Sequence, residues 1–260
     1  MKNILKQTTG LVLIGIAVMS CGKNDGYDDY LDNRGDIQLF SAAGDSSAII
    51  GKINQFRDLA GKALNSTPNA TGGRREINWD GVPAEFTSPG LFPANFFNLT
   101  DPAGVAGRKR GLVYTPENAQ LLVSDRGFSD IDQGYSQQFF AFSKNKVFSA
   151  KGTNITEVKF FVPGTHTPAY VSSFGIIFSD VDIAGSTGIE VYDGDKLIGR
   201  AGAQAADKKF SFLGLSSSTA KFTRVRIVSG NTALANGVQD GSTKDVVVMD
   251  DLIYSEPVAR

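Results

Sequence analysis

The sequence predicts a mostly β protein, a jelly-roll-like β-sandwich preceded by one accessory helix. After Gly73 the helical period disappears, and short apolar runs alternate with turn residues. Apolar and polar residues alternate along 188–192 and 224–228, as they do in strands that have one face in a core and one in water. The chain also holds 18 phenylalanines and 29 glycines, which favours strands joined by tight turns. Short strands at such spacing are typical of a sandwich or a barrel.

Four segments are expected along the chain. Residues 1–20 are expected to be a lipoprotein signal peptide, and residues 21–45 a lipidated N-terminus and a flexible tether. Residues 46–73 are expected to form the accessory helix and a linker, and residues 74–257 the β-sandwich.

The helix is predicted from apolar residues at three- and four-residue steps. Ser46 and Ser47 can cap its start, and its end is expected in the Asn-, Gly- and Pro-containing stretch at 65–73. The residues that repeat at helical spacing are Ile49, Ile53, Phe56, Ala60 and Leu64.

Nine strands are predicted from short apolar runs that end in turn residues. They are expected at Glu76–Trp79, Leu112–Tyr114, Gln137–Phe142, Glu157–Val162, Val171–Phe178, Gly188–Tyr192, Lys209–Leu213, Phe222–Val228 and Asp245–Tyr254.

The start of the chain indicates export. A basic start precedes an apolar run at 10–19, which ends just before Cys21, the single cysteine. The run is shorter than the about 20 residues that cross a bilayer, and its flanks suit a signal peptide. Val18–Cys21 resembles the lipobox of bacterial lipoproteins. This resemblance implies a lipid thioether on Cys21, cleavage before it, and fatty acylation such as palmitate on the new amino terminus. The alternative is a free core thiol.

Gly22 follows the cysteine where an aspartate would resemble inner-membrane sorting. The resemblance therefore implies an outer membrane lipoprotein in the cell envelope, held at the membrane through lipidated Cys21. Acidic residues soon after the cysteine loosely resemble a surface-export signal, and a plain solvated linker explains them equally well. A periplasmic and a surface-facing domain both stay open.

Several motifs together resemble a group of secreted bacterial proteins of unassigned function. The motifs are residues 73–83, 174–182, 212–215, 224–227 and 245–257. The likeness spans roughly residues 46–257. The C-terminal part of such proteins is similar to the galactose-binding-like jelly rolls of carbohydrate-binding modules, so the resemblance implies a sandwich that binds sugars. The step from fold to sugar is an analogy of folds.

An acidic set is the main candidate site. Its members are Asp80, Asp180, Asp182, Asp250 and Asp251. A closed sandwich brings first and last strands together, so these acids can meet. Calcium takes about six to eight oxygen ligands, and the resemblance implies a structural calcium in modules of this kind. In the alternative, the central two aspartates pair with Arg224 and Arg226, and the last two cap turns.

Exposed aromatic rings would form a sugar platform. Tyr192 alternates away from Val191 and is expected to face solvent, whereas Trp79 can serve as platform or as core. Paired carboxylates also suit glycoside hydrolysis, but nothing in the sequence fixes their separation. The single His166 could serve a Ser-His-Asp triad, but no Gly-x-Ser-x-Gly motif accompanies it. We therefore expect a binding protein and not an enzyme.

The charge balance excludes nucleic acid as an expected partner. Lys and Arg number 26 against 27 Asp and Glu, whereas phosphate binding needs a strongly basic face. The leading hypothesis is binding of carbohydrate or cell-envelope glycan. The competing ones are a structural or assembly lipoprotein that contacts another envelope protein, and a weak glycoside hydrolase. The sequence leaves the oligomeric state open.

Overall fold

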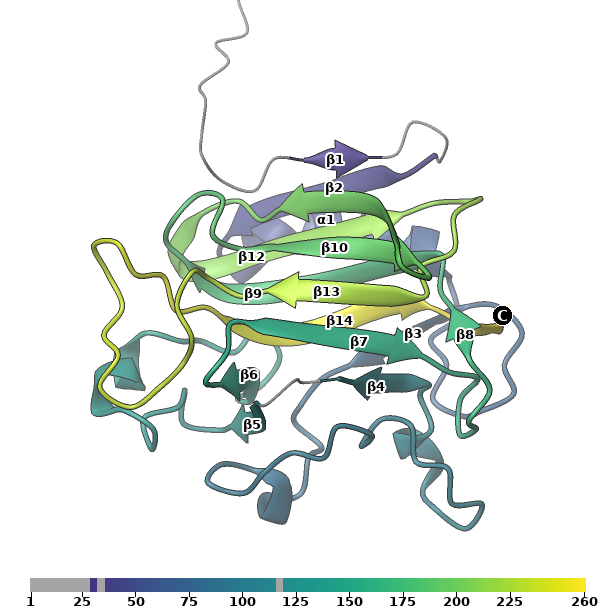
Figure 1. The fold of residues 1–260 in the computed structure, drawn as a ribbon, viewed down its shortest axis with the longest axis horizontal. Helices are drawn as coiled ribbons and strands as arrows, with labels where there is room; N and C mark the ends of the chain where they lie inside the picture. The colour runs from purple at the N-terminus through teal and green to yellow at the C-terminus, as the bar shows by residue number, and fades with distance from the viewer. Residues whose placement is uncertain (1–28, 32–35, 116–118) are drawn as a thin grey trace, which may run out of the picture.

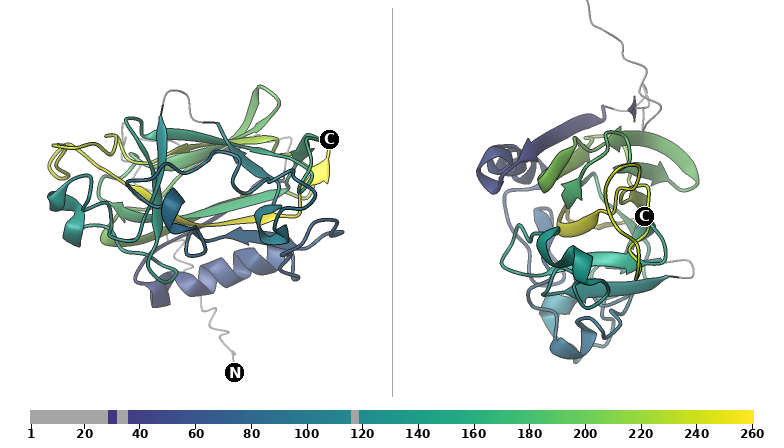
Figure 2. Two further views of the ribbon diagram at one scale, coloured as in Figure 1. Left: turned by 90° about the horizontal axis from the view of Figure 1, so that it is seen from below. Right: turned by 90° about the vertical axis from the view of Figure 1, so that its left-hand side faces the viewer.

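The computed structural model describes residues 29–31, 36–115 and 119–260. Two antiparallel sheets, one of six strands and one of seven, pack face to face. One helix lies on the outer side of the seven-stranded sheet (Figures 1 and 2). The predicted mostly β sandwich with one accessory helix is confirmed. No helix within the described ranges is long and apolar enough to cross a bilayer. The signal peptide and the lipobox with Cys21 lie outside the described residues.

One sheet has six strands and the other has seven. The first contains, in spatial order, β1 (Tyr30–Leu31), β11 (Lys196–Gly202), β10 (Gly188–Asp193), β13 (Arg224–Val228), β7 (Ile155–Phe160) and β4 (Leu112–Tyr114). The second contains β2 (Gln38–Gly44), β12 (Ala206–Ser216), β9 (Ser173–Val181), β14 (Val248–Ser255), β6 (Val147–Lys151) and β5 (Gln120–Ser124), and β3 (Arg74–Ile77) also pairs with β14.

The remaining elements are short. They are the pair β8 (Ala169–Tyr170) and β15 (Val258–Ala259), and 3-10 turns at Ala84–Phe86, Ala106–Arg108 and Gln133–Gln137.

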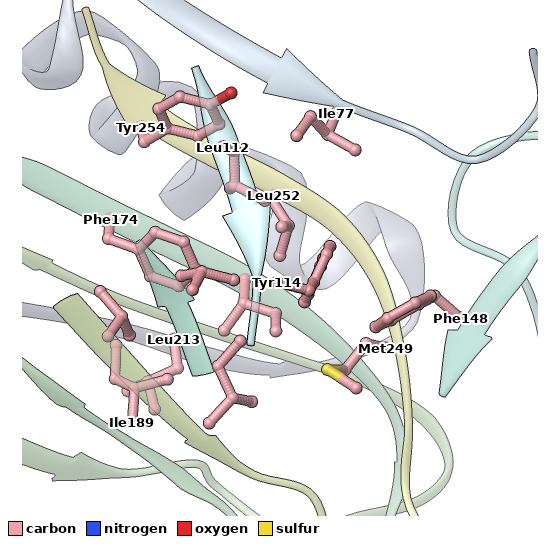
Figure 3. Close-up of a cluster of buried hydrophobic side chains, with 14 of the residues drawn as sticks. Ile77, Leu112, Tyr114, Phe148, Phe174, Ile189, Leu213, Met249, Leu252 and Tyr254 are labelled. Atoms are coloured by element: carbon pink, nitrogen blue, oxygen red, sulfur yellow. The ribbon is translucent and has the colours of Figure 1, made fainter. Parts of the chain in front are cut away.

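The main core fills the space between the sheets. Figure 3 shows side chains from both sheets meeting there, among them Phe174, Leu213, Ile189 and Tyr254. Every residue of β9 and of β14 is buried. These two strands are covered on both sides, so they have the nearly continuous apolar pattern that such strands need.

Helix α1 (Ser46–Ala60) covers the outer face of the seven-stranded sheet. Its buried side chains, Phe56 included, pack on β12 and β14 residues such as Phe212 and Ile253. The Phe56 ring lies over the cross-strand pair Gly175 and Gly214. A Cβ at these positions would lie 2.7 Å and 2.8 Å from that ring. The two glycines therefore allow the helix to approach the sheet.

Three sequence expectations near the helix are wrong. Residues 38–44, expected as tether, form strand β2, which pairs with β12 along its whole length. Phe40 and Ala42 of β2 pack against the apolar cluster beneath the helix, and this burial favours the strand. The helix ends at Ala60, and Leu64 is 56% exposed. Asp45, and not a serine, holds the N-cap position, without a side-chain bond.

Among the predicted strands, Gln137–Phe142 is wrong. A 3-10 turn ends at Gln137, and an irregular segment follows it. Phe139 packs in a separate cluster with Tyr135 and Leu122, while Phe140 is 44% exposed. The other eight predicted strands correspond to observed ones, with ends shifted by a few residues. Besides β2, the sequence does not predict β5, β6 and β11, nor the two-residue strands β1, β8 and β15.

A buried ion pair joins β3 to the end of the last long strand. Arg75 donates to Glu256 over 2.7 Å, and both side chains are almost inaccessible. Arg75 also donates to the Thr67 carbonyl over 2.9 Å, and Asn65 donates to the other Glu256 oxygen over 2.8 Å. The pair therefore fixes the linker after α1 as well as the strand.

Glu256→Ala is expected to lower the free energy of unfolding by roughly 3–5 kcal/mol, because it leaves the Arg75 guanidinium buried without a counter-charge. Asp193→Ala is the matched control: its pair with Arg260 spans 3.6 Å between exposed side chains, and its loss is expected to cost less than about 1 kcal/mol. Urea unfolding measures both. Equal losses in the two variants would contradict the assigned role of the pair.

Candidate functional site

Three carboxyl groups converge at one end of the sandwich. Asp180 lies near the end of β9, Asp182 follows the strand, and Asp240 comes from the loop before β14. Each offers one oxygen, and these oxygens all lie within 4.8 Å of one another. Asp180 is only 1% exposed and has a positive φ of 71°. We call Asp180, Asp182 and Asp240 the acidic cluster.

Asp245 holds the two loops of this region together. Its carboxylate accepts from the backbone N–H of Asp182 over 3.2 Å and of Ile183 over 3.1 Å, and from the Ser186 hydroxyl. Its backbone carbonyl accepts from the N–H of Asn231 over 3.1 Å. Asp240 in turn accepts from the Val246 N–H over 2.8 Å. The cluster therefore rests on backbone that is tied in place.

The electrostatics of the cluster are unfavourable. Desolvation raises the pKa of Asp180, while the Lys208 N–H, which donates over 2.6 Å, and the nearby Gln138 carboxamide oppose the shift. Desolvation, the charge of Asp180 and a bond to Asp240 raise the pKa of Asp182. Asp180 Oδ2 and Asp182 Oδ1 are buried and have no hydrogen-bond partner. Protons or a cation must offset this negative charge.

The structure divides the five aspartates expected at one site. Asp180 and Asp182 lie together, whereas Asp250 and Asp251 form a separate pair on β14, at an irregularity in its pairing with β9. The Phe142 N–H donates to Asp250 over 2.5 Å, and the Ser143 hydroxyl donates to Asp251 over 2.7 Å. Within the described residues, the acidic cluster is the single group of three or more possible metal ligands.

Asp80 lies outside both groups. Strands β3 and β14 do pair, as a closed sandwich requires, but Asp80 comes after the end of β3 and accepts from the Asn145 N–H over 3.2 Å. The sequence did not single out Asp240 as a ligand. It stands in the Asp-Gly-Ser sequence of a turn, and nothing local distinguishes it from a turn former.

The expected pairing of Asp180 and Asp182 with arginines is wrong. Arg224 pairs with Glu157 over 2.5 Å, and Arg226 with Glu190 over 3.6 Å, on the six-stranded sheet. Because side chains alternate along a strand, these arginines point away from the core and from β9. Asp250 and Asp251 cap no turn, since both lie within β14.

Tyr192 lies on the outer face of the six-stranded sheet, as expected, but it is half-buried. Its hydroxyl donates to Glu190, and the Arg224 guanidinium lies 3.8 Å from the centre of its ring. Glu190 also accepts from Arg200 over 3.1 Å. The register pairs Glu190 with Arg226 and Tyr192 with Arg224, so their side chains share one face. We call Glu157, Glu190, Tyr192, Arg200, Arg224 and Arg226 the tyrosine face.

A cavity of about 260 Å³ opens next to this face. It is lined by Thr115, Thr153, Ile155, Glu157 and Arg226. Two of these residues, Glu157 and Arg226, also belong to the tyrosine face. The lining combines hydroxyls, a carboxylate and a guanidinium, which are the groups that bind polar ligands by hydrogen bonds.

Trp79 belongs to the core and cannot serve as a platform. It is fully buried, its ring stacks on Phe148 with centres 4.3 Å apart, and its N–H donates to the Asp250 carbonyl over 3.1 Å. The ligand-binding expectation for Trp79 is therefore wrong. Its physical reason is that the chain after β3 turns inward between the sheets.

A second hollow lies at the other end of β9, near the start of the strand. Two neighbouring cavities of about 320 Å³ and 340 Å³ share Ser172 and Ser218 in their linings. Tyr170, with the Lys221 ammonium 4.9 Å from its ring centre, lines the first. Asp36 lines the second and already accepts bonds from Ser217, Ser218 and Thr219.

Comparison with protein-family models, curated proteins and solved structures finds no match to this chain. Its function therefore has to be inferred from the geometry.

Asp250→Asn is expected to make stability less dependent on pH. Desolvation, then the charge of Asp251, raises the pKa of Asp250 to about 9. A carboxyl with a raised folded pKa stabilises most below its unfolded pKa of about 4, and this contribution is lost as pH rises toward the folded pKa. Asn cannot ionise, so the stability of the variant relative to the wild type should increase as the pH rises from 5 to 8. The ratio of the two unfolding equilibrium constants should change by at most about tenfold per pH unit.

Urea unfolding at several pH values measures this difference. Asp125→Asn, which removes a largely exposed acid, should leave the slope of the wild type unchanged. Parallel profiles for Asp250→Asn and the wild type would contradict a shared proton at the Asp250–Asp251 pair.

Proposed function

We propose that this chain is a lipid-anchored protein of the bacterial cell envelope whose β-sandwich binds glycans on the tyrosine face. The observation that carries the proposal is the Tyr192 ring on an outer sheet face, fixed by Glu190 below its hydroxyl and by Arg224 against the ring. A ring held in this way gives a rigid apolar platform beside groups that form hydrogen bonds. Sugars need both, because they have apolar C–H faces and hydroxyl edges.

The position of the helix supports this choice of face. α1 covers the outer side of the seven-stranded sheet, whereas within the described residues no helix lies on the outer side of the six-stranded sheet (Figure 2). Its outward side chains lie on rigid strands, and sites on strands are positioned more precisely than sites on loops. The adjoining cavity beside Glu157 and Arg226 extends the surface by a hollow that a sugar ring can enter.

The charge of the face favours a glycan with acidic groups. The tyrosine face holds the guanidinium groups of Arg200, Arg224 and Arg226, and Lys159 is the cross-strand neighbour of Arg224. The carboxylates there are Glu157 and Glu190. Guanidinium groups bind carboxylate and phosphate in a planar, bidentate way. A cell-envelope glycan with uronic acid or phosphate groups therefore fits better than a neutral one.

The proposed role is binding without catalysis. Both carboxylates of the face are engaged by arginines, Glu157 by Arg224 and Glu190 by Arg200 and Arg226. A glycosidase needs a carboxyl that is available as a general acid, whereas both carboxylates of this face are bound by guanidinium groups. The alternative role is an assembly lipoprotein that contacts another envelope protein.

Tyr192→Ala is expected to weaken glycan binding at least about tenfold, or about 1.4 kcal/mol, because it removes the platform and releases Arg224. The full-length chain in detergent is first screened on a glycan array, and the acidic glycans that bind are then titrated against both proteins. Tyr170→Ala is the matched control, since Tyr170 lines the separate hollow near the start of β9.

Three results would count against this site. A loss with Tyr170→Ala and none with Tyr192→Ala would place binding in the other hollow. Preference for neutral glycans would contradict the role given to the arginines. An array without any binding would favour the assembly role.

Cys21→Ala is expected to release the protein from the membrane fraction or to leave it unprocessed, because stable anchoring needs more than one acyl chain. Fractionation of cells that express each form measures the release, and Ser20→Ala is the matched neighbouring change. Mass spectrometry that finds an unmodified Cys21 in membrane-bound, processed protein would overturn the anchor.

A further inference from the structure

We propose that Asp180, Asp182 and Asp240 bind one calcium ion at the end of β9. This site is separate from the tyrosine face. Asp180 and Asp182 belong to the acidic set expected from the sequence, whereas Asp240 replaces the other three aspartates of that set. Their oxygens lie within 4.8 Å of one another. Calcium binds oxygen at about 2.3–2.6 Å, so two oxygens on one ion are separated by no more than about 5 Å. The cluster fits within this span.

A second observation, independent of the clustering, points to a ligand. Asp180 is 1% exposed, and its Oδ2 has no hydrogen-bond partner. Asp182 Oδ1 is likewise buried and unpartnered. Buried polar atoms in native proteins are nearly always satisfied, and an unpaired buried carboxylate is costly. Two such oxygens in one cluster indicate that an ion completes their coordination.

Among the described residues, no cationic side chain takes the place of the ion, although the neutral Gln138 carboxamide lies near Asp180. The ion pairs of the described residues leave out all three aspartates of the acidic cluster. The single bond to Asp180 from the main chain comes from the Lys208 N–H and goes to Oδ1. The negative charge of the cluster is therefore not offset by lysine or arginine.

The ligand chemistry favours calcium. All three ligands are carboxylate oxygens, which hard cations prefer, and no histidine or cysteine belongs to the cluster. Magnesium requires nearly ideal octahedral geometry and keeps several waters, whereas calcium accepts irregular sets of oxygens. Asp180 and Asp182 lie on one chain segment, and Asp240 lies on another. An irregular set of this kind suits calcium.

The binding of calcium tests the site directly. The full-length chain in detergent is stripped with chelator, and its melting temperature is measured with and without calcium. Mass action predicts a rise of roughly 5 °C or more at a large excess over Kd. Elemental analysis should find one calcium per chain after dialysis against calcium, and an equal concentration of magnesium should give a smaller rise.

Asp182→Asn and Asp240→Asn should each lose most of the rise and the bound calcium. Asp250→Asn is the matched control, a buried aspartate outside the cluster, and should keep both. Asp240 lies in a loop and is half-buried, so its variant is expected to fold, as circular dichroism can verify. A stripped protein that neither gains stability nor binds calcium would overturn the proposal. A full response in Asp240→Asn, or an equal response to magnesium, would also overturn it.

Discussion

The buried ion pair between Arg75 and Glu256 is the contact on which the arrangement of the other layers depends. Arg75 belongs to β3, the first strand after the helix, and Glu256 follows β14. Their union keeps β3 on the edge of β14, where Tyr254 and Arg75 are cross-strand neighbours. The same two side chains bind the linker through Thr67 and Asn65. The helix is thus held over the seven-stranded sheet from both of its ends, by β2 before it and by the linker after it.

Burial on both sides of β14 explains why its acids need special partners. The helix covers one side and the main core fills the other, so Asp250 is inaccessible to water and Asp251 is nearly so. The segment around Phe142 and Ser143 supplies donors for them, and burial with mutual repulsion holds a proton on the pair. The acidic cluster has a similar excess of negative charge. The Lys208 N–H donates to Asp180 and the Val246 N–H donates to Asp240, but Asp180 Oδ2 and Asp182 Oδ1 keep no hydrogen-bond partner. The two groups of aspartates therefore differ in how fully hydrogen-bond donors satisfy them.

Sequence reasoning recovers the elements whose burial produces a clear pattern. The alternation at 188–192 predicts a strand buried on one side. The apolar runs of β9 and β14, the latter interrupted by Asp250 and Asp251, predict strands buried on both sides. The run at 137–142 is also rich in apolar residues but forms an irregular segment, in which Phe139 is buried and Phe140 is exposed. The strand at 196–202 has two glycines and a lysine start, so its pattern is weak without its neighbours. Nothing in the local sequence shows that 38–44 completes a sheet.

The candidate site shows the same limit. Asp180 and Asp182 are found by sequence, because carboxylates at the end of an apolar run are unusual. Their third neighbour, Asp240, is brought in by a loop fixed through Asp245, a contact that no spacing rule predicts. Pairing of β3 with β14 was a sound expectation, but it places backbones and not carboxyl groups side by side. Which acids meet depends on a strand irregularity and on loop paths.

The two proposed sites are connected by chain order. The segment after Asp182 leads directly into β10, which carries Glu190 and Tyr192. Its start is fixed by the bonds from Ile183 and Ser186 to Asp245, and the Thr187 hydroxyl accepts from the Gly230 N–H over 2.9 Å. An ion in the acidic cluster would hold both loops that position the beginning of this strand. The register of β10 with β13 sets which arginine lies against Tyr192. The strand that begins next to the acidic cluster is therefore also the strand that positions Tyr192 on the tyrosine face.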